Sequence, residues 1–404
     1  METNTLNQTP RSGRLHIGVY GRRNAGKSSL INALAGHQVA VVADVAGTTT
    51  DPVYKSMEIH GLGPCVLIDT AGYDDEGELG KLRVEKTVQA AAATDVAIVL
   101  FAAALSPEDD FAMERRWIDD FKKRQTPVLA LISQSDTVDS TEALAAAIEE
   151  KCGLRPLAVS VHQPGVREIL RVQLLRLLPE GREKASLAGH LIQPGDVVLL
   201  VMPQDIQAPE GRLILPQVQT IRDLLDHHGV AISATVQEMP AALAALRQPP
   251  ALIITDSQAF HQVYAMKPAE SRLTSFSVLL AAVKGDIATL IQGAEAVDGL
   301  TEQSHILIAE ACTHAPLSED IGREKIPRLL RKRLGQGLRI DMVSGTDFPE
   351  DLRPYDLIVH CGACMFNRKY MMHRVAAAVE AGTPITNYGL LLAKLNGILD
   401  KIDY

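Results

Sequence analysis

One stretch decides the fold of the first part of this chain: Gly21-Arg22-Arg23-Asn24-Ala25-Gly26-Lys27-Ser28, which fits the spacing G-x-x-x-x-G-K-[ST]. An apolar run at 15–20 precedes it, and a helical pattern follows from Ser29. In this context, backbone N–H groups of a curled loop and of a helix N-terminus face a phosphate group. The sequence therefore predicts a nucleotide site in which Lys27 bridges the β- and γ-phosphates and the Ser28 hydroxyl binds Mg²⁺.

Two further parts of a nucleotide site follow in order. In Gly47-Thr48-Thr49-Thr50-Asp51, a Thr hydroxyl and a main-chain carbonyl can complete the Mg²⁺ shell and sense the γ-phosphate. In Asp69-Thr70-Ala71-Gly72, the acid lies near the metal and the Gly72 N–H near the γ-phosphate. The ordered set resembles the small GTPase family, in the branch of tRNA-modification and ribosome-assembly GTPases, which shares the loop Asn and the Gly-Thr-Thr switch.

Base recognition departs from that family. It expects Asn-Lys-x-Asp after a later strand, and here the sequence reads Ser133-Gln134-Ser135-Asp136. Asp136 can still accept hydrogen bonds from guanine, so we expect GTP to bind with weakened affinity or selectivity. Ser160-Val161-His162 is a loose version of the last guanine-contacting loop.

The catalytic apparatus also departs from Ras-like enzymes, because Tyr73 stands where they have a Gln that orients the attacking water. By resemblance, Asn24 matches the residue that coordinates K⁺ in cation-activated members, so slow, K⁺-stimulated hydrolysis is expected; the alternative is that Asn24 only shapes the loop. Lys27, Thr49 and Gly72 are the predicted catalytic residues, and Ser28 and Thr49 the predicted Mg²⁺ ligands. The predicted nucleotide contacts are Gly21, Asn24, Ala25, Gly26, Lys27, Ser28, Ser29, Thr48, Thr49, Asp69, Gly72 and Asp136.

Composition narrows the function classes. The chain has 40 Lys and Arg against 49 Asp and Glu, a formal net charge of -9, and only 7 Phe, 8 Tyr and 1 Trp. Sequence-independent nucleic-acid binding needs clustered cations and stacking rings, so no nucleic-acid partner is expected. No apolar run reaches the roughly 18 residues of a spanning helix, and residues 1–14 lack the apolar core of a signal peptide, so we expect no membrane association and a cytoplasmic location.

The length of 404 residues predicts two or three domains. Residues 1–180 alternate β-rich runs with helical patterns, which predicts a parallel-rich sheet covered on both faces. Residues 190–268 repeat this alternation without a polar cluster, which favours an assembly role; the run at 197–203 is apolar on both faces and needs cover, which another subunit could supply. Residues 269–404 again alternate β-rich runs with helical patterns.

Three of the five cysteines fall in the last hundred residues, too few and too uneven for a disulfide framework. Cys312-Thr313-His314 follows one predicted strand and His360-Cys361-Gly362-Ala363-Cys364 another, at strand ends where open α/β sheets place ligands. Three thiolates suit a [4Fe–4S] cluster with one exchangeable iron, and a Cys₃His set suits a structural zinc equally well. The spacing alone does not distinguish an iron-sulfur cluster from a zinc ion. The other two cysteines, Cys65 and Cys152, are predicted to be packing residues.

Over residues 12–404 the chain resembles the [FeFe]-hydrogenase maturation GTPases, the HydF maturase family. The motifs that carry the resemblance are the GTPase set, the C-x-H … H-C-x-x-C pattern, and the switch segment Asp69-Thr-Ala-Gly-Tyr-Asp-Asp-Glu-Gly-Glu-Leu-Gly-Lys-Leu-Arg-Val-Glu-Lys86. The resemblance implies an α/β protein with three parts: a P-loop GTPase domain with a parallel-rich sheet (1–180), a small α/β dimerisation domain (190–268) and a C-terminal α/β iron-sulfur cluster domain (269–404).

The resemblance further implies a scaffold. Cys312, Cys361 and Cys364 would hold a [4Fe–4S] cluster, with His314 or His360 as the fourth ligand or a nearby hydrogen-bond donor. The cargo would be a di-iron precursor bearing CO, cyanide and a dithiolate bridge, built by two radical-SAM maturases and delivered to the apo-[FeFe]-hydrogenase. The scaffold would be a homodimer, and GTP hydrolysis would modulate its association with these partners.

Two rival functions are considered. An RNA-linked GTPase of the tRNA-modification or ribosome-assembly type shares the phosphate loop and the Gly-Thr-Thr switch, but the acidic balance and the lack of an RNA-binding module disfavour it. The basic segment 323–333 is typical of a solvated helix face. A zinc-stabilised interaction module with a vestigial GTPase is the other rival.

Overall fold

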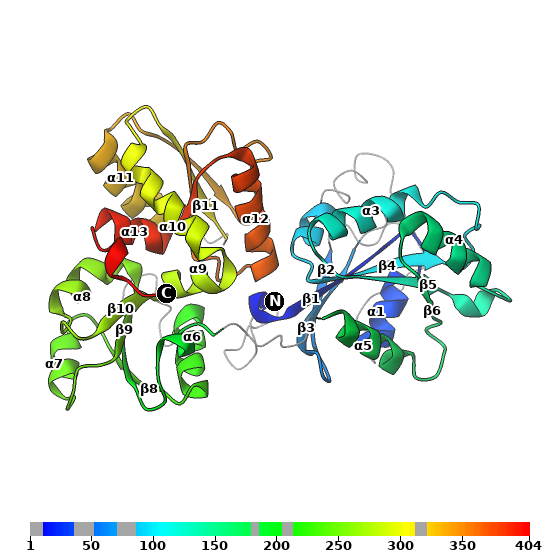
Figure 1. Ribbon diagram of the computed structural model, residues 1–404, viewed down its shortest axis with the longest axis horizontal. Coiled ribbons are helices and arrows are strands. Elements are labelled where there is room, and N and C mark those ends of the chain that lie inside the picture. Colours follow the sequence, from blue (N-terminus) through cyan, green and yellow to red (C-terminus); the bar gives the residue numbers. More distant parts are fainter. Residues whose placement is uncertain (1–10, 36–51, 71–85, 179–185, 204–212, 312–320) are drawn as a thin grey trace. The chain divides into compact units, whose positions relative to one another are not determined.

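The computed structural model describes residues 11–35, 52–70, 86–178, 186–203, 213–311 and 321–404. The chain divides into two compact units, residues 1–183 and 184–404, and the described residues form three sheets (Figure 1). Within the described ranges, no helix combines the length and the hydropathy that crossing a bilayer requires.

The first unit is built on a sheet with the strand order β2-β3-β1-β4-β5-β6. Every neighbouring pair is parallel except β2 with β3. The strands are β1 (Leu15–Gly21), β2 (Val53–Ile59), β3 (Gly63–Asp69), β4 (Val96–Ala102), β5 (Val128–Ser133) and β6 (Leu157–Ala158), and the labelled helices are α1 (Lys27–Ala35), α3 (Ala112–Lys123), α4 (Glu142–Cys152) and α5 (Val166–Leu177). The predicted parallel-rich sheet is confirmed, and the antiparallel β2 is an addition that its half-buried, mixed residues did not signal.

Helices cover both faces of this sheet. Leu30 of α1 and Leu170 of α5 share one buried cluster with the strands, and Ile118 of α3 and Ile148 of α4 share another. Both faces of the central strands are apolar for this reason. Cys65 and Cys152 are buried in these clusters, as packing residues would be.

The second unit contains two four-stranded parallel sheets. The middle sheet has the order β10-β9-β7-β8, formed by β7 (Val197–Val201), β8 (Val230–Ala234), β9 (Leu252–Thr255) and β10 (Arg272–Ser275), with α6 (Leu215–Asp226), α7 (Met239–Ala244) and α8 (Phe260–Met266). Because β10 pairs with β9, the middle sheet extends beyond residue 268, where the sequence led us to expect a domain boundary.

The last sheet has the order β12-β11-β13-β14. Its strands are β11 (His305–Glu310), β12 (Arg339–Ser344), β13 (Leu357–His360) and β14 (Ile385–Asn387), and the helices of this part are α9 (Phe276–Lys284), α10 (Ile287–Glu295), α11 (Ile326–Leu334), α12 (Arg368–Ala381) and α13 (Tyr388–Leu395). The chain runs from β11 to β12 on one side and then crosses to β13 on the other. The strand order therefore reverses between β11 and β13, which is where open α/β sheets bind ligands.

The two sheets of the second unit share a core. Leu199 and Ile253 from the middle sheet belong to the same buried cluster as Leu307 and Ile358 from the last sheet. Helices α9, α10 and α13 contribute to this cluster, and Figure 1 shows them where the two sheets approach each other. Leu199 and Val201 lie in this cluster, and Val198, Leu200 and Met202 lie in a second buried cluster on the other face. The apolar run at 197–203 is thus covered by the chain itself and does not need the cover from another subunit that its sequence suggested.

Candidate functional site

The phosphate loop has the backbone that its sequence predicts. It connects β1 to α1, and Asn24 and Gly26 have positive φ angles of 60° and 82°. Glycine adopts this region freely, and asparagine tolerates it better than most residues. These two positions turn the chain sharply, so the loop curls at the N-terminus of α1.

Lys27 and Ser28 lie at the first turn of α1. The Lys27 ammonium is buried and donates to the carbonyl oxygens of Gly21 at 2.9 Å and Arg22 at 2.8 Å, within the curl of the loop. Ser28 Oγ donates to Asp69 Oδ2 at 2.8 Å, which joins the two predicted magnesium-side oxygens. Burial raises the pKa of Asp69, against the hydrogen bond from Ser28 and the charge of Lys27. A buried carboxylate beside a hydroxyl is a donor set that suits Mg²⁺.

The degenerate base-recognition motif still supports the phosphate loop. Ser133 Oγ donates to the Ala25 carbonyl at 2.8 Å, and Gln134 Nε2 donates to the Asn24 carbonyl at 3.3 Å. Asp136 is ionised readily, because the side chain of Ser160 donates to it and lowers its pKa. Ser133 and Gln134 therefore connect the predicted base-recognition segment to the phosphate loop by hydrogen bonds. The resemblance to the GTPase family does not imply this role.

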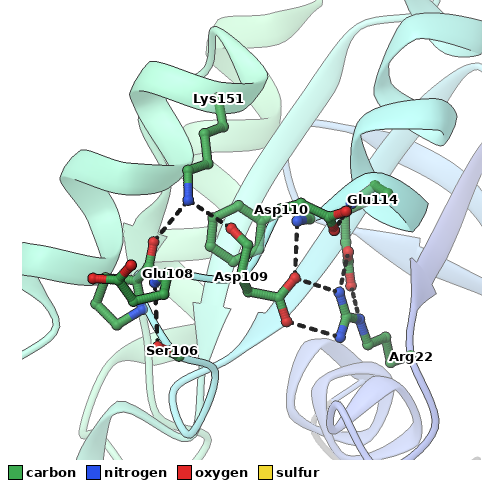
Figure 2. A network of polar contacts seen from close by, with 10 residues as sticks. Arg22, Ser106, Glu108, Asp109, Asp110, Glu114 and Lys151 are labelled. Atoms are coloured by element: carbon green, nitrogen blue, oxygen red, sulfur yellow. Dashed lines mark hydrogen bonds and ion pairs between the residues drawn. The ribbon is translucent and has the colours of Figure 1, made fainter.

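Arg22, inside the phosphate loop, makes four charge-assisted hydrogen bonds to two carboxylates (Figure 2). Its Nε donates to Glu114 Oε1 at 2.7 Å and its Nη2 to Glu114 Oε2 at 3.0 Å, while Nη1 and Nη2 reach the two oxygens of Asp109 at 3.2 and 3.1 Å. Glu114, on α3, is fully buried. The guanidinium lowers the pKa of Asp109, and its contacts with Glu114 and Asp109 raise its own pKa. Paired charge-assisted bonds of this kind fix geometry as well as adding energy.

The segment that presents Asp109 is itself anchored. Lys151 Nζ, near the end of α4, donates to the carbonyl oxygens of Pro107 at 2.9 Å and Asp109 at 2.7 Å, and lies 5.3 Å from the centre of the Phe111 ring. Figure 2 shows the ammonium and the guanidinium on opposite sides of this segment. The phosphate loop is thereby connected to both α3 and α4. The only sign of this connection in the sequence is Arg22 within the phosphate-loop motif, because its partners lie far along the chain.

Several predicted nucleotide contacts fall outside the described residues: Thr48, Thr49 and Gly72, with the rest of Gly47-Thr-Thr-Thr-Asp51 and Tyr73. The predicted site residues that the structure brings together are Gly21, Asn24, Ala25, Gly26, Lys27, Ser28, Ser29 and Asp69, with Asp136 linked to Ser160.

The cysteine pair lies at the carboxyl end of the parallel strands of the last sheet. Cys361 directly follows β13, and Ala309 of the neighbouring β11 is paired with His360, so the two strands end side by side. The predicted third ligand, Cys312, and the candidate His314 come shortly after β11, outside the described residues. Within the described ranges, no group of three His, Cys, Asp or Glu side chains converges as a metal site.

The surroundings of Cys361 fit a sulfur ligand. The backbone N–H of Ala311 donates to Cys361 Sγ at 3.0 Å, a contact of the kind that tunes cluster sulfurs. Ala363 is buried with a left-handed φ of 51°, which bends the C-x-x-C loop. Burial and the neighbouring Cys361 raise the pKa of Cys364. Two thiols brought together on a sharply bent loop are a donor set suited to an iron-sulfur cluster or to zinc.

Lys284, at the end of α9, holds this loop. Its buried ammonium donates to three carbonyl oxygens: Ala363 at 2.9 Å, Cys364 at 3.2 Å and Phe366 at 2.7 Å. Burial lowers the pKa of Lys284 to about 8, against the charges of Cys364 and Cys361.

His360 is engaged within the protein. It is fully buried, its Nδ1 lies 2.9 Å from the Cys361 carbonyl oxygen, and its Nε2 lies 2.8 Å from Arg374 Nη1. A guanidinium can only donate, so Nε2 accepts and the ring proton is on Nδ1. Of the two roles expected for His360, these contacts favour the hydrogen-bonding role over that of a fourth ligand.

Three family models match the chain. A model described as the hydrogen maturase F dimerization domain matches residues 187–285, and one described as the hydrogen maturase F tetramerization domain matches residues 288–402. Residues 16–134 match a model described as a 50S ribosome-binding GTPase.

The chain is also similar to tRNA modification GTPases MnmE. The protein from Cupriavidus metallidurans is 34% identical over 200 residues, 44% of this chain and 41% of that relative. The protein from Ralstonia nicotianae is 36% identical over 172 residues, 40% of this chain and 34% of that relative. The chain therefore spans less than half the length of these relatives.

Among solved structures, a variant of Era from Aquifex aeolicus bound to GDP and AlF4⁻ is 18% identical, with a TM-score of 0.36, and the match covers 57% of this chain and 97% of that one. Era in complex with MgGDPNP and nucleotides of 16S ribosomal RNA is also 18% identical with a TM-score of 0.36, covering 55% of this chain and 91% of that one. The two hydrogen maturase F models together match more than half of the residues, beside a GTPase domain, and the chain belongs to the hydrogen maturase F (HydF) family.

Proposed function

We propose that this chain is a GTP-hydrolysing scaffold of [FeFe]-hydrogenase maturation. It binds a [4Fe–4S] cluster, accepts a di-iron precursor from radical-SAM maturases as cargo, and transfers it to the apo-[FeFe]-hydrogenase. The observation that carries the proposal is the Cys361 and Cys364 pair in the region that matches the hydrogen maturase F family, at the point where the strand order reverses.

Cys312, Cys361 and Cys364 hold the cluster in this proposal, with His314 as the candidate for the fourth position. When bound, the cluster supplies an iron with an exchangeable position for the cargo. The chain's own residues shape the site: Lys284 fixes the loop that carries Cys364, and the N–H of Ala311 hydrogen-bonds to Cys361 Sγ.

At the other end, residues 1–180 bind GTP and Mg²⁺. Lys27 contacts the β- and γ-phosphates, Ser28 and Thr49 bind the metal near Asp69, and Thr48 and Gly72 complete the γ-phosphate side. Asn24 coordinates a K⁺ that stimulates slow hydrolysis, and the reaction modulates association with the partner proteins. The paired Ser28 and Asp69 side chains support this assignment.

The middle part of the chain provides self-association as a homodimer. The dimerization model at 187–285 and the tetramerization model at 288–402 support assembly through both parts of the second unit.

The cluster is tested by anaerobic reconstitution of the full chain, comparing wild type with Cys361→Ala. We expect bound iron and sulfide and a [4Fe–4S] EPR signal in the wild type, and loss of that signal in the variant. Cys152→Ala, which removes a buried thiol from the first unit, is the matched control and should keep the cluster. A colourless zinc protein, or one that co-purifies with RNA, contradicts the proposal.

The GTPase role is tested with Lys27→Ala. Removing the ammonium from the phosphate loop should lower GTP hydrolysis by about 10²-fold or more, because a positioned cation stabilises charge in the transition state. Partner release and hydrogenase activation should fall with it. Unchanged release and activation alongside lost hydrolysis would show that nucleotide turnover does not serve maturation.

A further inference from the structure

The side chain of Arg374, on α12, is buried with an incomplete set of partners. It is 1% exposed, its Nη1 donates to His360 Nε2, and its Nη2 donates to the Gly345 carbonyl at 2.7 Å. Its Nε, also buried, has no hydrogen-bond partner. Among the described residues, no carboxylate pairs with it at hydrogen-bond distance, and the carboxylate of Asp347 acts on its charge only through a longer-range electrostatic interaction.

Three aromatic rings surround the guanidinium instead. Its central carbon lies 4.6 Å from the centre of the Phe348 ring, 4.8 Å from that of Phe366 and 5.2 Å from that of Tyr370. Rings at these distances attract a cation through their quadrupoles, but they do not neutralise its charge. A buried charge without a contacting counter-ion is unfavourable. The described residues offer only the longer-range charges of Cys361 and Asp347, so a further anion beside the guanidinium would be stabilised.

Lys284 is a second cation of the same kind, on α9. Carbonyl oxygens accept from all three of its N–H donors, and no carboxylate of the described residues pairs with it. Both cations act on the cysteine pair: the charge of Cys361 interacts with Arg374 and with Lys284, and that of Cys364 with Lys284.

The connection from Arg374 to the cysteines passes through His360. Its guanidinium donates to His360, and the Nδ1–H of His360 donates to the carbonyl oxygen of Cys361. Because Arg374 and His360 are buried, removing the guanidinium charge changes the field at Cys361 with less screening by water than a surface charge would have.

We infer that Arg374 and Lys284 are the counter-charges of an anionic iron-sulfur cluster held by Cys361 and Cys364, and that they set how readily the cluster accepts an electron. A thiolate-bound [4Fe–4S] cluster is anionic and becomes more so on reduction, and its potential depends on nearby charge. Two buried cations favour the reduced form and raise the midpoint potential. This inference rests on the proposed function.

The test is an EPR-monitored redox titration of the anaerobically reconstituted full chain. Arg374→Gln should lower the midpoint potential so that the oxidised-to-reduced ratio at a fixed potential rises at least about tenfold, which is about 59 mV for a one-electron couple. Arg374→Lys keeps a charge and should stay close to wild type. Arg328→Gln removes an exposed charge from α11 and should change nothing.

Three results separate the possibilities. A wild-type chain that binds no cluster refutes the proposed function, whereas a cluster-bearing Arg374→Gln with the potential of Arg328→Gln refutes only the inference. An Arg374→Lys variant that shifts as far as Arg374→Gln also overturns it, because shape rather than charge then matters. If Arg374→Gln does not fold, Lys284→Gln compared with Lys284→Arg applies the same criteria at the second cation.

Discussion

Arg22 and Arg374 are two arginines beside two ligand sites, and the chain treats their charges in opposite ways. Arg22 lies in the phosphate loop and is neutralised by Glu114 and Asp109 at distances of 2.7 to 3.2 Å. Arg374 lies behind the cysteine loop and is more deeply buried. It contacts His360, a backbone carbonyl and three rings, whereas the carboxylate of Asp347 acts on it only at longer range.

The difference separates structure from ligand binding. The charge of Arg22 is already paired with two carboxylates, so it attracts a nucleotide only weakly. Arg22 therefore fixes the phosphate loop against α3, and Lys27 is the cation available to contact the phosphates. A buried guanidinium that the chain does not neutralise keeps its field for whatever binds next to it. Whether a buried cation is paired with a carboxylate therefore indicates its role better than how deeply it is buried.

The largest expected effect is at Arg22. Arg22→Gln leaves the fully buried Glu114 without its cation, which should lower the free energy of unfolding of the first unit by about 3 kcal/mol. Trp117 is the single Trp of the chain, stacked on Tyr20 with ring centres 5.3 Å apart, so its fluorescence in urea reports on this unit.

Its control removes both charges. The double variant Arg22→Met with Glu114→Leu replaces the ion pair by apolar side chains and should recover most of the lost stability. If the double variant is as unstable as Arg22→Gln, the contacts of Arg22 matter for shape rather than for charge, and the contrast with Arg374 weakens.

Arg374→Gln should have a smaller effect on the protein without cluster. Two hydrogen bonds and three ring contacts are lost, but an unneutralised buried charge is also removed, so the net loss should be about 1 kcal/mol. Hydrogen exchange of peptides from β13 and α12 measures it, with Arg328→Gln as the exposed control. A loss as large as that of Arg22→Gln would mean that the chain already compensates this charge.

Much of both sites could be predicted from the sequence. The phosphate loop was identified because its spacing specifies a backbone, and the positive φ angles of Asn24 and Gly26 follow from it. The cysteine pair is predictable at a strand end because Leu357–His360, apolar apart from the histidine, directly precedes it. Local patterns of this kind need no knowledge of distant contacts.

The other features of the fold and of the sites depend on contacts between residues that are far apart in the sequence. Helices α9 and α13 cannot be predicted from periodicity, because they are apolar on most sides and lack the polar face that signals a helix. Their N-caps, Ser275 and Asn387, were the available signal, since both side chains accept a backbone N–H of the first turn.

The sequence also contains a signal for the unusual position of Arg374. It occupies the buried stripe of α12 with Tyr370, Met371, Val375 and Ala378, where a charged residue is unexpected. The partners of such a residue cannot be predicted from helix periodicity, because Gly345 and His360 come from other elements. The pairing of Arg22 with Glu114, 92 residues away, is hidden for the same reason.

The smallest expected effect is the pH dependence that Arg22 gives to the first unit. Arg22 holds the pKa of Asp109 below its ordinary value. A carboxyl group whose pKa is lower in the folded state adds stability above its unfolded pKa of about 3.9 and loses it as the pH falls through the folded value. The Asp109 side chain is 24% exposed, so screening limits this contribution to about 0.5 kcal/mol.

Between about pH 5.5 and about pH 3.5, the wild type should therefore lose about 0.5 kcal/mol more than Asp109→Asn, measured by Trp117 fluorescence in urea. Asp119→Asn, which removes an exposed carboxylate from α3, should follow the wild type. Equal pH slopes in the wild type and Asp109→Asn would mean that Glu114 alone neutralises Arg22. The contrast between the two arginines would then depend on a single buried carboxylate, present in one unit and absent from the described part of the other.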